Sequence, residues 1–288
     1  MESRRVVRRI DHLFVSVEDA QAVFEMLQSR LGLVVLAPIQ DWGPFTSGAF
    51  NLGNIYLEIL QTQPGLPAAP PDALEVNGLA FEPEPLDVAL GELDRRRIAH
   101  SPPIPMVRPE GIELPAWNAP LEIDPEPAPG SPLFVNVVVP GPVGDNAIVF
   151  CSESVIAPTS AWREAMRTKL DDMPDRGLPI DSVTEVVVGA KDVEAERDRW
   201  QALVDPVTEQ TPGSWRFDGG PALRLVEFGH DAIVGLTLQV ASLDRAERYL
   251  KDHGMLASST GNELAISPEA LDGLNLTLVG ERGRHRRV

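Results

Sequence analysis

The chain has 288 residues, of which 43% are apolar and 24% charged, as is typical of a soluble globular protein with room for two ordinary domains. The net charge of −18 argues against nucleic acid as a partner, because phosphate binding requires concentrated Lys and Arg. No apolar run approaches the length of about 18 residues that a membrane-spanning helix needs, so we expect no membrane span.

The single cysteine, Cys151, excludes an internal disulfide and is typical of a reducing compartment. The N-terminus leads directly into a strand pattern rather than into an apolar signal core, which favours a cytoplasmic location. A short basic run, 282–288, ends the chain and is expected to be a solvated tail. The composition leaves open whether the protein is a monomer or a homodimer.

The first unit of the chain begins with Ile10–Asp19, in which apolar residues alternate around His12 as in a half-buried strand. An amphipathic helix is predicted to follow over Ala20–Leu33. Three further strands are then predicted, at Leu33–Leu36, Phe45–Leu52 and Ile55–Gln61.

Two polar residues interrupt these buried patterns. His12 lies within the first strand, and Glu58 lies between Leu57 and Ile59 on the last strand. Because an unpaired charge is costly to bury, each is expected to have a partner, which can be a metal, a substrate or the other of the two. A carboxylate partner would also suit the His12 imidazole to act as a general acid or base near neutral pH.

The second unit repeats this order, with a short strand at Gly78–Phe81 and a helix over Leu86–Arg97. Two strands close the unit, Leu133–Val139 and Ala147–Cys151. The intervening stretch 101–132 is too rich in proline for a regular helix or a central strand. It is predicted to be a long loop or lid with Trp117 at its middle.

A helix over Pro158–Met173 is predicted to connect this pair of units to a second pair. The third unit begins with a strand at Val183–Val188 and the fourth with a strand at Gly235–Leu238. Helices over Asp192–Leu203 and Leu243–His253 follow them. The later strands are predicted at Trp215–Phe217, Ala222–Phe228, Glu263–Ile266 and Leu274–Val279.

The units align with one another without gaps. Setting His12 on Glu185 places Asp19 on Asp192, with apolar residues matching in between, and the second and fourth units match in the same way from their first glycines. Self-similarity of a whole strand–helix–strands unit indicates a repeat architecture. The sequence therefore predicts an α+β fold of four βαβββ modules paired into two domains, at 1–153 and 181–281, joined by a helix and linker at 154–180.

These patterns resemble the vicinal oxygen chelate superfamily, which includes glyoxalases, bleomycin-resistance proteins and extradiol dioxygenases. The resemblance is carried by Asp11–Val17, by Tyr56–Leu60 and by a Gly-Leu strand followed by Leu-Asp-x-Ala in two units, and it covers about residues 9–280 apart from the insertion 101–132 and the connecting helix. It implies glyoxalase-like domains in which two modules enclose one cavity. A divalent metal (Mn, Fe, Ni or Zn) is held there by a first-strand His or Gln and a last-strand Glu of each module, and substrates bind it through neighbouring oxygens.

Carried over residue by residue, the resemblance implies that His12 and Glu58 are metal ligands and catalytic residues. The second module departs from the family pattern, since Gly78 occupies its first ligand position. Its last strand has no carboxylate between apolar residues, and only Cys151, Ser152 or Glu153 could reach the cavity. The alternative is a cavity that uses His12 and Glu58 without a metal, because open catalytic sites usually have about three protein ligands.

The third module has Glu185 in place of the histidine and Arg224 in place of the glutamate. These two residues are expected to form an internal ion pair, with ligand binding as the alternative. Extradiol dioxygenases hold their iron in the C-terminal pair of modules. Because this pair lacks the two histidines, iron-dependent ring cleavage is disfavoured.

Four aromatic residues are candidates for lining an apolar pocket, although each is by default an ordinary core residue: Trp42, Phe45, Trp117 and Trp215. Trp42 and Trp117 are the stronger candidates because they lie in predicted loops. Cys151 is interpreted as a small buried hydrophobe rather than a nucleophile, because no basic neighbour in the sequence would activate it.

Three functions remain open from the sequence. The first is a metal-dependent lyase or isomerase that acts on a small oxygenated organic molecule in the N-terminal cavity. The second is a metal-free protein that binds and sequesters a small molecule, as the bleomycin-resistance branch does. The third is a degenerate, largely structural paralogue. Fold membership alone does not choose among them, because one fold hosts many chemistries.

Overall fold

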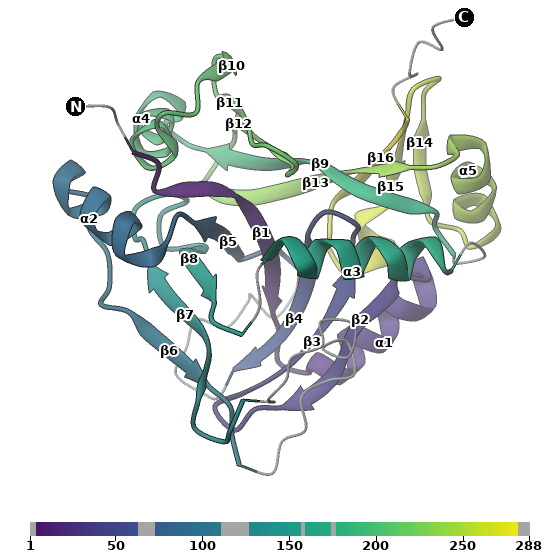
Figure 1. The fold of residues 1–288 in the computed structure, drawn as a ribbon. Helices are drawn as coiled ribbons and strands as arrows, with labels where there is room; N and C mark the ends of the chain where they lie inside the picture. The colour runs from purple at the N-terminus through teal and green to yellow at the C-terminus, as the bar shows by residue number, and fades with distance from the viewer. Residues whose placement is uncertain (1–3, 63–72, 111–126, 157–158, 174–176, 282–288) are drawn as a thin grey trace, which may run out of the picture.

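The computed structural model describes residues 4–62, 73–110, 127–156, 159–173 and 177–281, and these form two eight-stranded sheets (Figure 1). Each sheet is built from two βαβββ modules, so the predicted α+β fold of four modules is confirmed. The strand orders are β2-β3-β4-β1-β5-β8-β7-β6 and β10-β11-β12-β9-β13-β16-β15-β14. None of the helices in the described part of the chain is long and apolar enough to span a membrane.

The first sheet contains the first two modules. The elements of the first module are β1 (Val7–Ser16), α1 (Ala20–Leu31), β2 (Val34–Asp41), β3 (Phe45–Asn51) and β4 (Tyr56–Thr62). Those of the second module are β5 (Gly78–Pro83), α2 (Leu86–Arg96), β6 (Ile104–Val107), β7 (Pro132–Val138) and β8 (Ile148–Ser154). Helix α3 (Thr159–Asp171) lies between the last strand of the first sheet and the first strand of the second.

The second sheet contains the other two modules. The third module comprises β9 (Ile180–Ala190), α4 (Val193–Val204), β10 (Glu209–Thr211), β11 (Ser214–Arg216) and β12 (Ala222–Glu227). The fourth comprises β13 (Ala232–Val240), α5 (Leu243–Asp252), β14 (Leu256–Ser259), β15 (Glu263–Ile266), the 3₁₀ turn η2 (Pro268–Leu271) and β16 (Leu276–Gly280).

The strand registers confirm the alignment of the modules. Within each module the first strand pairs in parallel with the last, and the two modules of a sheet meet through their antiparallel first strands. Phe14 of β1 lies beside Glu58 of β4, and Val187 of β9 lies beside Arg224 of β12. His12 and Glu185 each precede these first-strand residues by two positions, so they occupy equivalent places in the two sheets.

The helices begin where their capping residues predict. The Asp19 side chain accepts a hydrogen bond from the backbone N–H of Ala22 at the start of α1, and Asp192 does the same for Ala195 at the start of α4. A side-chain oxygen at this position satisfies one of the N–H groups that the first helical turn leaves unpaired. The two aligned aspartates therefore cap their helices in the same way in the first and third modules.

One continuous core lies between the two sheets and joins the halves of the chain. Phe81 of β5 packs against Trp200 of α4 and against Phe217, which directly follows β11, with ring centroids 6.1 and 5.6 Å apart. Asn54 exchanges two hydrogen bonds of 2.8 Å with the backbone of Val183. The face of each sheet that points away from this core is therefore the one available for a site.

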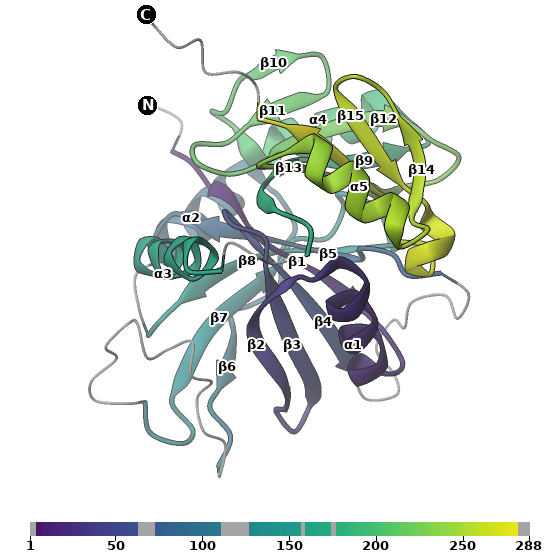
Figure 2. The ribbon, with the colours of Figure 1, turned by 90° about the vertical axis from the view of Figure 1, so that its right-hand side faces the viewer.

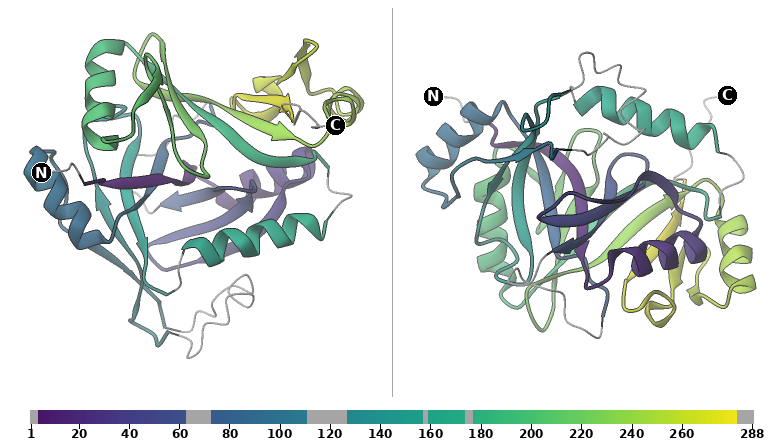
Figure 3. Two further views of the ribbon diagram at one scale, coloured as in Figure 1. Left: turned by 45° about the horizontal axis from the view of Figure 1, so that its top comes forward. Right: turned by 90° about the horizontal axis from the view of Figure 1, so that it is seen from below.

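Helix α3 lies on the outer side of the first sheet. Figure 2 shows α1 and α3 on opposite sides of strands β2–β4, and the two views of Figure 3 show the same relation. The helix is anchored by buried Met166 and Leu170 and by a hydrogen bond of 2.7 Å from the Asn51 side chain to the Met166 carbonyl. It therefore covers the sheet as well as connecting the halves.

The proline-rich stretch 101–132 is in part regular, contrary to the prediction of a long loop. Ile104–Val107 forms β6, which pairs with β7 at the outer edge of the first sheet. An edge strand tolerates proline because one of its two sides makes no ladder hydrogen bonds, and Pro105 occupies such a strand. Trp117 lies outside the described residues, as do the basic tail 282–288 and the whole segment 63–72.

Candidate functional site

A cavity of about 830 Å³ lies on the outer face of the first sheet, beneath α3 and β6. Strand β4 shows why the sequence opens it there: Tyr56, Glu58 and Leu60 line the cavity, while the alternate residues Leu57 and Ile59 are buried in the core. Successive strand residues point to opposite faces, so one strand serves both surfaces. The apolar lining includes Leu36, Trp42, Phe45, Met106, Phe134 and Phe150.

His12 and its sequence neighbour Asp11 both reach this cavity, which regular alternation would forbid. The explanation is a β-bulge in β1: Ile10 pairs with Phe81 and His12 with Ala80, so that Asp11 is an extra residue. The bulge lets the Asp11 carboxylate contact the imidazole, with Oδ2 2.8 Å from Nδ1. His12 is only 5% exposed, and this bond holds its ring in place.

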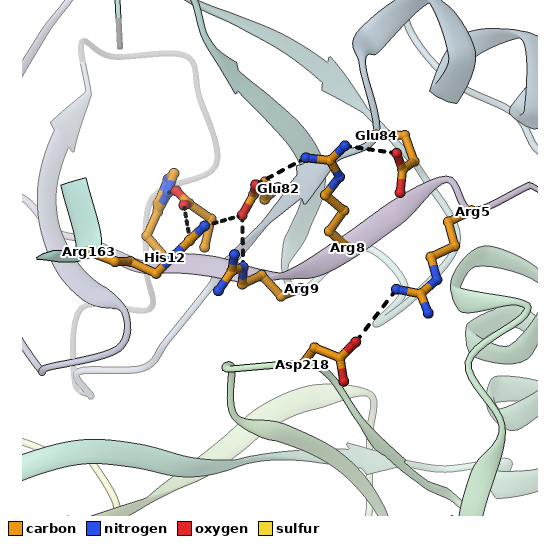
Figure 4. A network of polar contacts seen from close by, with 9 residues as sticks. Arg5, Arg8, Arg9, His12, Glu82, Glu84, Arg163 and Asp218 are labelled. Atoms are coloured by element: carbon orange, nitrogen blue, oxygen red, sulfur yellow. Dashed lines mark hydrogen bonds and ion pairs between the residues drawn. The ribbon is translucent and has the colours of Figure 1, made fainter. Parts of the chain in front are cut away.

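The Asp11–His12 pair is tied to a buried ionic network (Figure 4). Arg163 of α3 reaches Asp11 at 3.8 Å and donates a hydrogen bond of 2.6 Å to Glu82 of β5. Glu82 also accepts a hydrogen bond of 2.9 Å from Arg9. The polar end of the cavity is thus built from β1, β5 and α3 together, and α3 helps to fix it.

Aromatic rings surround His12. The Tyr56 ring is stacked on the imidazole with centroids 4.5 Å apart, and the Phe150 ring meets it edge-on at 5.5 Å. Burial raises the pKa of the Tyr56 phenol well above its ordinary value, and the negative charges of Asp11 and Glu58 raise it further. The phenol is therefore neutral at physiological pH.

Gly78 is explained by the floor of this cavity rather than by ligand chemistry. A Cβ atom at Gly78 would lie 1.8 Å from the nearest atom of the Phe14 ring. Phe14 packs with Ala80 and Phe150 in a small cluster beside the cavity. At the first ligand position of the second module, the space that a side chain would occupy is consequently filled by the Phe14 ring of the first module.

Glu58 lines the same cavity as His12, but the two side chains are not hydrogen-bonded to each other in the described part of the chain. Of the three partners that the sequence leaves open for each residue, the direct pair of His12 with Glu58 is not formed among the described residues, and Asp11 contacts the Nδ1 atom of the imidazole. Among the described residues, the Glu58 side chain forms no hydrogen bond or ion pair, and its negative charge helps to raise the pKa of the Tyr56 phenol.

The fit of this site to a divalent metal is incomplete. The described residues contain no group of three His, Cys, Asp or Glu side chains arranged to hold a metal ion. His12 and Glu58 remain two candidate ligands, one fewer than open catalytic sites usually have. On the last strand of the second module, Ser152 lines the cavity, whereas Glu153 accepts a hydrogen bond of 3.0 Å from the N–H of Leu86 at the start of α2.

Cys151 lies fully buried in the core, and burial raises the pKa of its thiol to about 12. The interpretation as a small buried hydrophobe agrees with this position. Trp42 and Phe45 line the cavity, with ring centroids 6.3 Å apart, and contact with a ligand stays a prediction for both. Trp215 has the default role of a core residue instead of lining the cavity, because its ring is fully buried and donates a hydrogen bond of 2.8 Å to Gln201.

Glu185 and Arg224 form the predicted ion pair in the second sheet, with Nε and Oε2 2.9 Å apart. The pair is not internal, however, since 42% of the Arg224 side chain and 24% of the Glu185 side chain are exposed. The equivalent positions of the two sheets have therefore diverged, into a buried histidine in one and a partly solvated ion pair in the other.

Sequence reasoning missed Asp11 and Arg163. In a regular strand the side chains of Asp11 and His12 point to opposite faces, and nothing in the residue pattern predicts the bulge. The role of Arg163 in the site was missed because its helix was interpreted only as a connection between the two halves of the chain. The one available signal was that Asp11 is a charged residue inside a predicted buried strand.

No protein-family model matches the chain, and no curated protein matches it. Solved structures do. A hypothetical protein from Staphylococcus aureus aligns with a TM-score of 0.58 at 9% identity, over 94% of this chain and 98% of that one. A triple mutant of 4-hydroxymandelate synthase from Streptomyces coelicolor aligns with a TM-score of 0.61 at 13% identity, over 96% and 94% of the two chains.

Homoprotocatechuate 2,3-dioxygenase from Brevibacterium fuscum, in its complex with 3,4-dihydroxyphenylacetate, aligns with a TM-score of 0.59 at 12% identity. The alignment covers 96% of this chain and 82% of that one. Identities this low show the fold and not the activity. The chain therefore shares the fold of these structures, with two sheets of paired βαβββ modules, which is the fold that the resemblance to the vicinal oxygen chelate superfamily implied.

Proposed function

We propose that this protein binds one small, largely apolar organic molecule in the cavity of the first sheet. The observation that carries the proposal is the cavity itself, whose volume of about 830 Å³ lies in the range of ligand sites, about 300–1,000 Å³. Apolar walls with a few convergent polar groups are typical of such sites. An open cavity of this size also argues against the degenerate, structural alternative, which requires it to be filled.

His12 provides the polar anchor in this proposal. A neutral imidazole has one donor and one acceptor nitrogen, and a carboxylate only accepts. Since Asp11 faces Nδ1, that nitrogen carries the hydrogen and Nε2 is left as the acceptor. Nε2 is thereby suited to accept a hydrogen bond from a hydroxyl group of the ligand, while Tyr56 and Phe150 contact its apolar body.

Equilibrium binding of an uncharged aromatic probe, 2-naphthylmethanol, tests this proposal by calorimetry. Phe45→Ala removes an aromatic wall of the cavity and should weaken binding about tenfold. Phe228→Ala is the matched control and should leave affinity unchanged, because Phe228 is 43% exposed at the end of β12, in the other half of the chain. Absence of binding, or equal losses in both variants, would refute the assignment of the cavity.

A metal-dependent lyase or isomerase is the second candidate, and one observation favours it. Metal-binding histidines usually donate their other ring N–H to a carboxylate, which is the arrangement of His12 with Asp11. His12 and Glu58 would be the ligands for Mn, Fe, Ni or Zn. Ring cleavage by an iron in the second pair stays disfavoured, because Glu185 and Arg224 occupy the equivalent positions.

Metal analysis of protein purified without chelator or affinity tag separates the two candidates. Near-stoichiometric metal that is lost in both His12→Ala and Glu58→Ala would support the enzyme. No uptake after incubation with manganese, iron, nickel and zinc would reject it and leave the metal-free binding protein.

A further inference from the structure

The acidic side chains that line the cavity outnumber the basic ones. Its lining contains two carboxylates and one guanidinium, those of Asp11, Glu58 and Arg163. Arg163 is already engaged, since it contacts Asp11 at 3.8 Å and Glu82 at 2.6 Å. The Glu58 side chain, by contrast, forms no hydrogen bond or ion pair with a lysine or arginine in the described part of the chain, although it lines the same cavity.

The sequence of the adjoining segments does not supply a cation for Glu58. Segment 63–72 follows β4, and segment 111–126 lies between β6 and β7. Neither contains a lysine, an arginine or a histidine. The whole chain carries a net charge of −18, so that its general field reinforces the local one.

An apolar ligand that filled the cavity would create a problem at Glu58. The carboxylate is partly buried on β4, and because none of the described residues pairs with its side chain, the hydrogen bonds of an ionised Glu58 are left to water. Displacing that water without replacing its hydrogen bonds loses affinity, and leaving a desolvated charge is more costly still. A ligand that fits this cavity should therefore bring its own donor to Glu58, and a cationic donor makes the strongest such bond.

The walls beside Glu58 suit a cation as well. Tyr56 is two residues away on the same face of β4, and its phenol remains neutral. Trp42, Phe45 and Phe150 present further aromatic rings to the same cavity. Aromatic faces attract a nearby ammonium group and still pack against an apolar body.

We propose that the ligand is a protonated amine on an aromatic or otherwise apolar body, with its ammonium group bound by Glu58. This inference rests on the proposed function, because it assumes that the cavity binds a small molecule without a metal at Glu58. It adds the charge of the ligand, which the apolar walls alone leave open.

Three probes that share one ring system test the inference: 2-naphthylmethylamine, which is protonated at neutral pH, 2-naphthylmethanol and 2-naphthoate. Calorimetry in the presence of EDTA keeps Glu58 free of metal. The amine should bind about tenfold or more tightly than the alcohol, and the carboxylate most weakly. In Glu58→Gln the amine should lose this advantage, while the affinity for the alcohol changes little.

Two further variants separate a local contact from the general field. Glu227→Gln changes net charge by the same unit at an exposed position of the second sheet and should leave the preference for the amine intact. Glu58→Asp retains the charge and should retain part of the preference. Binding of the alcohol by each variant shows that its cavity is folded.

The outcomes are distinct. Equal affinities for amine and alcohol in the wild type, or a preference that survives in Glu58→Gln, would overturn the inference and leave the cavity as a binding site for uncharged molecules. Failure of all three probes to bind would overturn the proposed function and this inference with it.

Discussion

Replacing Arg163 by methionine would test whether α3 is held to the first sheet by the buried ionic network. The Arg163 and Glu82 side chains are 14% and 8% exposed, and their hydrogen bond measures 2.6 Å. Hydrogen bonds to charged groups contribute about 1.5–3 kcal/mol. Because Glu82 keeps Arg9 at 2.9 Å, it is not left unpaired, and we expect Arg163→Met to lower the free energy of unfolding by about 2 kcal/mol.

Removing the carboxylate of Glu82, at the centre of the network, should lower the free energy of unfolding more than Arg163→Met does. Three guanidinium groups, those of Arg8, Arg9 and Arg163, face Glu82 at 3.8, 2.9 and 2.6 Å. Glu82→Gln leaves them together without their shared counter-ion, and removing one partner of a buried ion pair costs about 3–5 kcal/mol. The expected order of destabilisation is therefore Glu82→Gln above Arg163→Met.

Urea unfolding at neutral pH measures both changes, and Arg5→Met is the matched control. Arg5 pairs with Asp218 at 3.8 Å, but their side chains are 44% and 94% exposed, so its loss should change stability by less than about 0.5 kcal/mol (Figure 4). If Arg163→Met behaved like Arg5→Met, or if Glu82→Gln were the milder change, the reasoning about a buried network would be refuted.

Three other results are expected. Gly78→Ala should destabilise the fold by about 2 kcal/mol or more in urea unfolding, because the added Cβ would overlap the Phe14 ring. Gly91→Ala on helix α2 is the control: its Cβ meets no atom within 4 Å, and the change should stabilise the fold by up to about 1 kcal/mol. An unchanged stability of Gly78→Ala would contradict the packing of Phe14 against Gly78. Cys151 should resist iodoacetamide at mildly alkaline pH until the protein is denatured, because burial raises the pKa of its thiol to about 12; rapid labelling of the native protein would show it to be accessible. Arg224→Met should change unfolding stability by less than about 1 kcal/mol, since that side chain is 42% exposed, and a larger loss would mean that the ion pair is shielded from solvent.

The fold could be predicted from the sequence because its signals are local and repeated. Alternating apolar residues define β1 and β4, and Asp19 and Asp192 each begin a helix at aligned positions. Repetition made each signal stronger, since an assignment in one module could be checked against another. Strand β6 was missed because a proline-rich edge strand of four residues has no periodicity to detect.

The site was only partly predictable. His12 and Glu58 could be found because each is a polar residue in a buried pattern. Their partners could not, since the contact of Asp11 with His12 depends on a bulge and that of Arg163 on how α3 folds back over the sheet. Such contacts depend on how segments far apart in the sequence pack together, and the spacing of residues does not show this. The place of Trp215 stayed open for the same reason, because a tryptophan in a short strand can face either the core or a cavity.

A crystal structure of the protein with 2-naphthylmethylamine tests the central claim most directly. The account predicts the naphthalene ring in the cavity of the first sheet, among Tyr56, Phe45 and Phe150, with the ammonium group within hydrogen-bond distance of Glu58. A ligand bound on the second sheet, or bound in the cavity with its ammonium group directed away from Glu58, would contradict it.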